Sequence, residues 1–369
     1  MINKKRIADR FLSLAAIDSP SFGERRMADR LTWELKKLGL PVEEDGAAAE
    51  IHGNAGNLFA RLDGGSGEPV LLAGHMDTVD PSRGKKPLLH ADGTITSDGT
   101  TVLGADDLGG VTAILESLTS VLEDGLPRRP LEILFSAAEE PYDRGSEAFD
   151  FRRIRSREAY VFDLDGEVGG AACAAPSICS FAVEVRGKSS HAGFAPEEGI
   201  HAISAAASAI RDLKMGRVDS ETTLNVGIIR GGSAANIVPD LCTVKGELRS
   251  YSNEKAEKLL DTVVDTFSKA AASIGAACRT ESRFGCRAYQ ISPGEPVARE
   301  YREACKKAGV EADFFRTFGG SDANQLNSHG IRSLAAASAM HRVHTCREYT
   351  KVGEIAKVAE IIQALLLCR

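Results

Sequence analysis

The most decisive stretch of this chain is Leu71-Leu72-Ala73-Gly74-His75-Met76-Asp77-Thr78-Val79. An apolar run that ends in polar residues is typical of a buried strand in an open α/β sheet, where ligands bind at the carboxyl ends of strands. In a regular strand, residues two apart share one face, so His75 and Asp77 would point the same way. His75 is therefore a candidate metal ligand, and Asp77 could accept a hydrogen bond from its other ring nitrogen. A hydrogen-bonded surface pair is the competing interpretation and the more common one for this pair taken alone.

Strands and helices alternate on both sides of this stretch. Helices are predicted within residues 4–38, interrupted near 19–21, and at 109–122. Near-continuous apolar runs are typical of strands that are covered on both faces. The alternation predicts an α/β domain with a mixed sheet. Its strands are predicted at 57–62 and 68–73, which the turn Asp63-Gly64-Gly65 joins, and at 131–137 and 160–162.

A different pattern begins near residue 178. Its order of strand, helix, strand, strand, helix and strand is that of a ferredoxin-like unit. A chain of 369 residues also exceeds what one core usually serves. We therefore expect two domains: residues 1–177 with 289–369, and an inserted domain of 178–288. The predicted elements of the insertion are 180–186, 199–213, 222–229, 242–250, 254–274 and 277–283.

Four more carboxylates and another histidine are candidate ligands. They are Asp106 before a helix, Glu139 and Glu140 after the run 131–137, Asp163 after 160–162, and His344 near the C-terminus. A mixture of carboxylates and imidazoles suits zinc or a similar first-row ion. These residues are too many for one tetrahedral ion, and their number suits two ions that share a carboxylate.

Simpler interpretations exist for the carboxylates. Asp106 and Asp107 precede a helix, where Asp is a common cap, although one could cap while the other bridges two ions. Adjacent Glu139 and Glu140 repel one another unless they face solvent or a cation. At a di-metal centre, one of the two would bind metal and the other would remain free as a general base.

Spacing alone leaves two choices of ligand open. Asp163 and Asp165 both follow the apolar run 160–162, and His341 and His344 lie three residues apart. His191, in Gly187-Lys188-Ser189-Ser190-His191-Ala192-Gly193, cannot be assigned to the metal set from its sequence position.

The composition excludes several function classes. Hydrophobic residues make up 43% and charged residues 26% of the chain, and the net charge is −7, as in ordinary globular proteins. No Lys/Arg block predicts nucleic-acid binding, and no apolar run reaches the ~20 residues of a membrane span. The N-terminus does not resemble a secretory signal. The eight cysteines are scattered without a Cys-x-x-Cys pair, which predicts reduced thiols in a cytoplasmic protein. No Gly-x-Ser-x-Gly, P-loop or dinucleotide fingerprint is present.

Five motifs in order resemble a known family. They are Gly-His-Met-Asp-Thr-Val at 74–79, Gly-Ala-Asp-Asp-x-Gly-Gly at 104–110, Ala-Glu-Glu at 138–140, Gly-Lys-Ser-Ser-His-Ala-Gly at 187–193, and Gly-Gly-x-x-x-Asn-x-Val-Pro within 231–239. Together they resemble the di-zinc metallopeptidases that include peptidase T, glutamate carboxypeptidase and aminoacylase. The likeness covers about residues 5–365. It is closest to peptidase T-like proteins, because of Asp-Arg-Gly-Ser-Glu-Ala-Phe at 143–149 and the His344-Thr345 element.

This resemblance implies a catalytic domain that binds two zinc ions per chain, or other first-row divalent metals, and an inserted lid domain that forms a homodimer. It also implies that Asp77 orients His75 and that Glu139 is the general base. It favours Asp163 over Asp165 and His344 over His341. The implied ligands are His75 and Asp163 for one ion, Glu140 and His344 for the other, and Asp106 for both; the implied substrate contacts are His191 from the partner subunit, Asn236, Arg249 and Gly320.

The activity implied by the resemblance is metal-dependent hydrolysis of amide bonds in short peptides, as in a tripeptide aminopeptidase. Water would be activated by zinc, Glu139 would take its proton, and His191 would stabilise the oxyanion. A carboxypeptidase or an N-acyl-amino-acid amidohydrolase would use the same centre, and a non-catalytic metal-binding scaffold is a third alternative. The sequence decides neither the direction of cleavage nor the peptide length nor the native metal.

Overall fold

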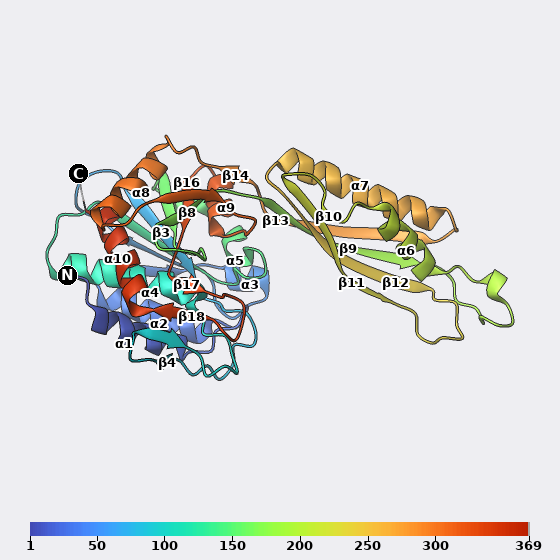
Figure 1. Cartoon of the computed structure of the whole chain (residues 1–369), viewed down its shortest axis with the longest axis horizontal. Helices are drawn as coiled ribbons and strands as arrows, with labels where there is room; N and C mark the ends of the chain where they lie inside the picture. Colours follow the sequence, from blue (N-terminus) through green and yellow to red (C-terminus); the bar gives the residue numbers. More distant parts are fainter. Residues whose placement is uncertain (368–369) are drawn as a thin grey trace. The chain divides into compact units, whose positions relative to one another are not determined.

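The computed structural model describes residues 1–367, which form two compact units (Figure 1). One unit comprises Met1–Ala174 together with the chain from Gln290 onward, and the other comprises Ala175–Tyr289. Within the described residues, no helix is long and apolar enough to cross a membrane.

A mixed sheet forms the centre of the first unit. Its strand order is β1-β2-β6-β3-β7-β16-β8-β14, and β15 pairs with β8 in parallel. The four inner strands β6, β3, β7 and β16 are parallel, so their carboxyl ends meet at one edge. The strands are β1 (Val42–Glu44), β2 (Leu58–Leu62), β3 (Val70–His75), β6 (Leu131–Ser136), β7 (Glu158–Val161), β8 (Gly170–Ala175), β14 (Tyr289–Gln290), β15 (Asp313–Arg316) and β16 (Arg332–Ala336).

The turn predicted at Asp63-Gly64-Gly65 does not pair the two strands that flank it. β6 lies between β2 and β3, antiparallel to the first and parallel to the second. All six residues of β3 and of β6 are buried. This central position explains their near-continuous apolar sequences, because both faces of these strands are covered.

Helices pack around this sheet, and α4 is the most deeply buried of them. It lies against α1, α10 and β3, and every residue from Ala105 to Val121 is buried. The helices of the unit are α1 (Lys4–Ala15), α2 (Arg25–Lys37), α3 (Ala47–Ile51), α4 (Ala105–Glu123), α5 (Arg144–Glu147), α8 (Pro296–Lys307), α9 (Asp322–Ser328) and α10 (Val352–Leu366), with a 3₁₀ turn at Phe151–Arg153.

A small sheet joins the C-terminal segment to the first half of the chain. Its order is β17-β18-β5-β4, and β18 pairs antiparallel with β5. This pairing brings the residues around His344 to the segment that precedes Asp106. The strands are β4 (Leu88–Leu89), β5 (Thr94–Thr96), β17 (Met340–His341) and β18 (Tyr349–Lys351).

The second unit has the predicted order of elements, with one additional two-residue strand, β10. Its antiparallel sheet has the order β10-β11-β12-β9-β13, and α6 and α7 pack on one another and on this sheet. Alternate residues of β9, such as Phe181, Val183 and Val185, are buried against Phe267 and other apolar side chains of the helices. The elements are β9 (Ser177–Arg186), a 3₁₀ turn (Pro196–Glu198), α6 (Ala202–Asp212), β10 (Gly216–Arg217), β11 (Thr222–Gly231), β12 (Leu241–Ser250), α7 (Asn253–Ala272) and β13 (Ala277–Cys286).

Candidate metal centre and active site

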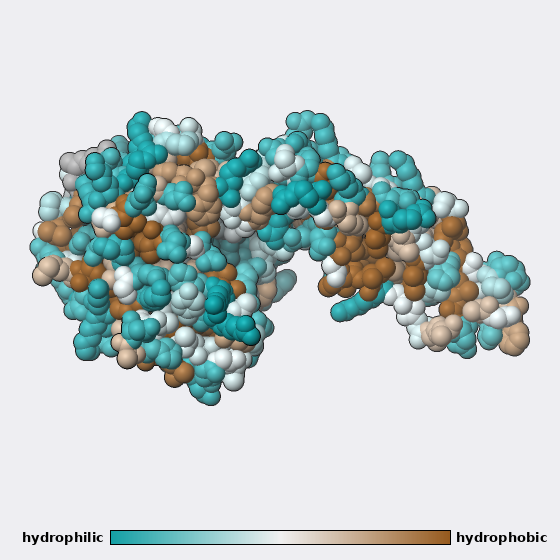
Figure 2. All heavy atoms as spheres, in the orientation of Figure 1, coloured by the Kyte–Doolittle hydropathy of each residue, from teal (hydrophilic) through white to brown (hydrophobic). Residues whose placement is uncertain are grey.

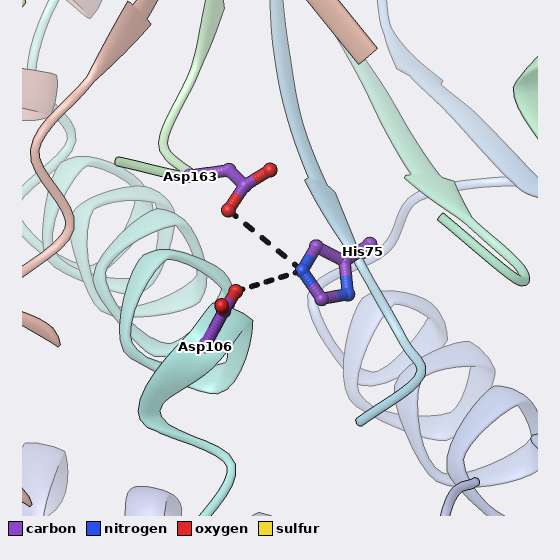
Figure 3. Close-up of side chains that lie close together, drawn as sticks. All are labelled: His75, Asp106 and Asp163. Atoms are coloured by element: carbon purple, nitrogen blue, oxygen red, sulfur yellow. Dashed lines mark hydrogen bonds and ion pairs between the residues drawn. The ribbon is translucent and has the colours of Figure 1, made fainter. Parts of the chain in front are cut away.

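The last residue of β3, His75, lies among carboxylates from two other elements. Its Nε2 atom is 3.0 Å from Asp106 Oδ1, near the start of α4, and 3.7 Å from Asp163 Oδ1, just after β7 (Figure 3). On the opposite side of the ring, Nδ1 is 3.0 Å from the main-chain oxygen of Asp77. Because a carbonyl oxygen only accepts, Nδ1 carries a proton, and Nε2 is the atom that can bind a cation between the carboxylates.

A second group of ligand-type atoms shares Asp106 with the first. The Nε2 atom of His344 is 3.1 Å from Asp106 Oδ2 and 3.1 Å from Glu140 Oε2. In each group, one atom from each of three residues lies within 4.8 Å of the others. The imidazole of His344 is 53% exposed, whereas that of His75 is 1% exposed. The centre is therefore closed around His75 and open to solvent at His344.

Two glycines allow Asp106 to approach the strand ends. A Cβ atom on Gly110 would lie 2.0 Å from the carbonyl oxygen of Phe162, and one on Gly109 would lie 2.6 Å from that of Ser338. The start of α4 therefore packs directly on the backbone that precedes Asp163. A side chain at either glycine would push the helix away and separate Asp106 from the other ligands.

The two neighbouring aspartates make different contacts. Asp107 accepts the N–H of Gly110 through Oδ1 and the N–H of His75 through Oδ2, both at 3.3 Å. Asp107 thus caps the helix and fixes the end of β3, while the carboxylate of Asp106 faces the two histidines.

The Asp77 side chain contacts more than the imidazole of His75. Its carboxylate oxygen is 3.4 Å from Nδ1 of His75, farther than the main-chain oxygen of the same residue. The carboxylate instead accepts the backbone N–H groups of Glu139 at 2.9 Å and Glu140 at 3.3 Å, and the hydroxyl of Ser21 at 2.7 Å. The Asp77 carboxylate therefore positions the backbone of the Glu139-Glu140 turn more directly than it positions the imidazole of His75.

The electrostatics of the cluster favour a bound cation. Burial opposes charge on His75, yet Asp106 and Asp163 raise the pKa of its imidazole well above the ordinary value. Hydrogen bonds to its two carboxylate neighbours raise the pKa of His344 to about 10. Burial, and then the charge of Asp163, raises the pKa of Glu139 well above its usual range. Buried carboxylates this close together require protons or metal ions to compensate their charge.

The donor set fits divalent metal ions. Two histidine–carboxylate groups that share one aspartate offer the nitrogen and oxygen ligands that zinc and similar ions prefer. Among the described residues, the buried Oε1 atom of Glu140 has no hydrogen-bond partner, which leaves it available as a ligand. Glu139 belongs to neither group, although it is buried (8% exposed) and, like Glu140, follows β6.

The alternative candidates, His341 and Asp165, lie outside the two ligand-type groups. Nε2 of His341 is 2.5 Å from Glu354 Oε2, at the start of α10, and its ring stacks on Tyr349. Asp165 forms an isolated bridge with Met340 and, within the described chain, belongs to neither ligand-type group.

In the second unit, His191 and Asn236 lie together. The main-chain oxygen of Asn236 accepts the N–H of Ala192 at 3.0 Å. Nδ1 of His191 accepts the N–H groups of Gly193 and Phe194 at 3.1 and 3.2 Å, which leaves Nε2–H as the donor of the neutral ring.

Arg249 lies toward the other end of the same unit. It is eight residues from the start of β12, so at about 3.3 Å per residue it is roughly 26 Å along the strand from Leu241, which follows the Asn236 loop. Its guanidinium pairs with Glu247 at 2.8 Å. Within a single copy of the unit, Asn236 and Arg249 are therefore far apart, because most of one strand separates them.

Gly320 precedes the first turn of α9. Ser321 caps this helix, and the buried carboxylate of Asp322 accepts a hydrogen bond from Ser136, the last residue of β6. The segment of Gly320 is thereby tied to the carboxyl edge of the central sheet.

Sequence reasoning missed two buried glutamates that bind backbone near the ligands. Glu24 accepts the N–H groups of Phe22 at 2.7 Å and Ala138 at 3.0 Å. Glu348 accepts three backbone N–H groups at the start of α4. Burial raises the pKa of each carboxyl to about 7. Apart from Phe22, their partners are far away in sequence, so the available signal was an acidic residue beside a motif: Glu348 lies four residues after His344.

The chain is similar to known peptidases over nearly its whole length. The profile of the peptidase dimerisation domain (M20) matches residues 174–274, and that of peptidase family M28 matches residues 57–211. The uncharacterized protein YqjE of Bacillus subtilis (strain 168) is 34% identical over 99% of both chains.

Two crystal structures extend this likeness to the fold. Aminopeptidase PepT from Bacillus cereus ATCC 10987 has a TM-score of 0.89 and 36% identity, and the match covers 99% of this chain and 98% of that one. A tripeptidase (SAV1512) from Staphylococcus aureus subsp. aureus Mu50 has a TM-score of 0.94 and 32% identity, with the same coverage of 99% and 98%.

Proposed function

The chain belongs to the peptidase T-like family of M20 metallopeptidases, and on that premise we propose that it is an aminopeptidase of short peptides, tripeptides above all, with two zinc ions per chain. The enzyme class is that of a metal-dependent peptide hydrolase. The observation that carries the finer proposal is the pair of histidine–carboxylate groups that share Asp106. The direction of cleavage and the peptide length are supported by the structural relatives, which are an aminopeptidase and a tripeptidase.

We assign the ligands as the distances suggest. His75 and Asp163 bind one ion, Glu140 and His344 bind the other, and Asp106 binds both. Bound in this way, paired zinc ions supply Lewis acidity and lower the pKa of water toward ~7.

Glu139 is the general base of the proposed reaction. Its carboxylate lies beside the centre but outside both ligand groups, so it remains free to exchange a proton. In the proposed reaction it takes the proton of the attacking water. The same oxygen then carries that proton to the amine that leaves.

We further propose a homodimer formed through the second unit. The matched dimerisation profile supports it, and so does the outer edge of β11. The short strand β10 pairs with β11 up to Leu224, and Ile228 and Ile229, farther along β11, are 45% and 49% exposed. Figure 2 shows an apolar patch over this strand.

The dimer also accounts for the separation of Asn236 from Arg249. In this proposal, Arg249 and the Gly320 segment are further contacts of the peptide. His191 and Asn236 reach the substrate of the partner, where the Nε2–H of His191 stabilises the oxyanion.

The cytoplasmic location expected from the scattered cysteines also stays a prediction.

Hydrolysis of a peptide panel tests the function. The panel contains dipeptides, tripeptides and tetrapeptides, each with and without an N-acetyl group, and the protein is used metal-free and after addition of zinc. We expect cleavage of free-amine tripeptides only, dependent on zinc and yielding the N-terminal amino acid. Cleavage of acetylated peptides would instead support the carboxypeptidase or amidohydrolase alternative.

Glu139→Gln is the matched variant for this panel. It keeps the shape of the side chain and both ligand groups, so we expect zinc content to stay the same while turnover falls by at least ~100-fold, the usual contribution of a general base. Unchanged turnover would remove Glu139 as the base. Bound zinc without cleavage of any peptide would favour a metal-binding scaffold.

A further inference from the structure

We propose that Glu348 is a positioning residue that joins the His344 loop to the start of α4 and thereby sets the affinity of the metal site formed by Asp106, Glu140 and His344. The inference deepens the proposed function and rests on its metal centre. It concerns a residue that belongs to neither group of candidate ligands.

The carboxylate of Glu348 is buried and accepts hydrogen bonds from three backbone N–H groups. The residue is 2% exposed. Its Oε2 atom accepts the N–H groups of Leu103 and Gly104, each at 2.7 Å, and its Oε1 atom accepts the N–H of Asp106 at 2.9 Å. These donors are separated from Glu348 by more than 240 positions in the sequence. One side chain therefore connects the segments that carry two of the three ligands of this site.

One of the connected segments has a backbone conformation that needs support. His344 has a φ angle of +60°, in the left-handed region that residues with a side chain rarely adopt. Such a conformation persists when surrounding contacts determine it. The bond between His341 and Glu354 anchors the loop before His344, and Glu348 anchors it afterwards. Of these two anchors, only Glu348 also contacts the backbone of Asp106.

Glu348→Gln keeps the size of the side chain and replaces one acceptor by a donor. If the amide oxygen takes the place of Oε2, it keeps the bonds to Leu103 and Gly104, but the amide NH₂ then faces the N–H of Asp106. The opposite orientation loses two bonds instead of one. The favoured orientation thus places the conflict on Asp106, and the geometry of its carboxylate changes with its backbone.

Zinc binding to purified metal-free protein is the direct test, measured by competition with a chelating indicator dye. Wild-type protein should bind two zinc ions. Replacing a residue that orients metal ligands usually costs 10- to 100-fold in affinity. We expect that loss for one of the two ions in Glu348→Gln and a smaller loss for the other, because two of three ligands are displaced in one site and only the shared Asp106 in the other.

The His344→Ala variant identifies which ion is weakened. It should lose the same ion that Glu348→Gln weakens, and adding Glu348→Gln to it should change the affinity of the remaining ion by less than about threefold. If the two substitutions weaken different ions, the assignment of Glu348 to this site is wrong.

Glu132 offers a matched control. It is also 2% exposed, and its carboxylate accepts the N–H groups of Arg155 at 3.0 Å and Ser156 at 2.9 Å, near the start of β6. It differs from Glu348 in also accepting the Ser156 hydroxyl and pairing with Arg61 at 3.1 Å. Glu132→Gln should lower the melting temperature of the metal-free protein and leave both zinc affinities within about threefold. Equal weakening of both ions by Glu348→Gln, or the same zinc affinities in both glutamine variants, would mean that Glu348 only stabilises the fold.

Glu348→Asp serves if the glutamine variant is insoluble. It keeps the charge but is shorter by one methylene, so it should weaken the same ion. The test separates this inference from the proposed activity. Two bound zinc ions, the expected selective loss and no peptide cleavage would refute the aminopeptidase and keep the role of Glu348. A wild-type protein that binds only one zinc ion would overturn both.

Discussion

Replacing Asp77 by asparagine tests which atom orients the ring of His75. The substitution keeps the shape of the side chain and leaves the main-chain oxygen, 3.0 Å from Nδ1, in place. The carboxylate that it removes accepts three hydrogen bonds, from the backbone of Glu139 and Glu140 and from Ser21. We therefore expect the damage to fall on the Glu139-Glu140 turn and to spare the proposed metal ligand His75.

The magnitude follows from the hydrogen bonds that an amide cannot accept. With its amide oxygen in the place of Oδ2, the new side chain would keep Glu140 and Ser21 as donors, and its NH₂ would face the buried N–H of Glu139. An unsatisfied buried donor costs about 1–3 kcal/mol, and more where a charged acceptor is lost. A cost of about 2–3 kcal/mol at the general base corresponds to a roughly 30- to 150-fold lower rate.

The assay compares kcat on a free tripeptide with zinc content in the same preparation. Asp77→Asn should lose activity at full zinc occupancy. Ser21→Ala removes one of the three donors and leaves the carboxylate, so it should cost about 1 kcal/mol, or roughly fivefold in kcat. If Asp77→Asn loses zinc in proportion to activity, the carboxylate at 3.4 Å orients the ring after all, and the reasoning from the main-chain oxygen is refuted.

Three further predictions concern charge, assembly and the second unit. Burial lowers the pKa of Lys85 from 10.5 to about 8, so its folding cost is complete below pH 8 and disappears as pH rises toward 10.5. Lys85→Met should therefore raise the free energy of unfolding at pH 7 by up to about 3 kcal/mol but hardly at pH 10.5, whereas exposed Lys86→Met should change neither in urea titrations. Ile229→Glu should place a charge on the open part of β11 and convert the dimer to monomer in analytical ultracentrifugation, while an unchanged dimer would exclude this edge. Mixing inactive His191→Ala with inactive Glu139→Gln should restore activity if His191 acts across the dimer, and no recovery after demonstrated subunit exchange would indicate action within one subunit.

Much of the fold could be predicted because its signals are local. The apolar run before His75 indicated a buried strand, and the alternation of apolar residues in β9 indicated a sheet with one covered face. The order of elements between residues 178 and 288 followed from the same periodicities. The pairing of β6 between β2 and β3 did not, because strand neighbours depend on contacts between distant segments. The turn at 63–65 is compatible with either arrangement.

By itself, the sequence determined the chemical inventory of this protein: which residues are able to bind metal, and that His75, Glu140 and Asp163 follow predicted strands of one sheet. Spacing alone left open the choice between His341 and His344, and between Asp163 and Asp165, because two candidates a few residues apart have the same local pattern. The resemblance favoured His344 and Asp163, and the tertiary structure places these two beside Asp106 and His75. The tertiary structure also decided that Asp77 and Glu348 bind the backbone around the ligands. Backbone N–H groups are the same at every residue except proline, so a side chain that binds them leaves no mark in the sequence of its partners.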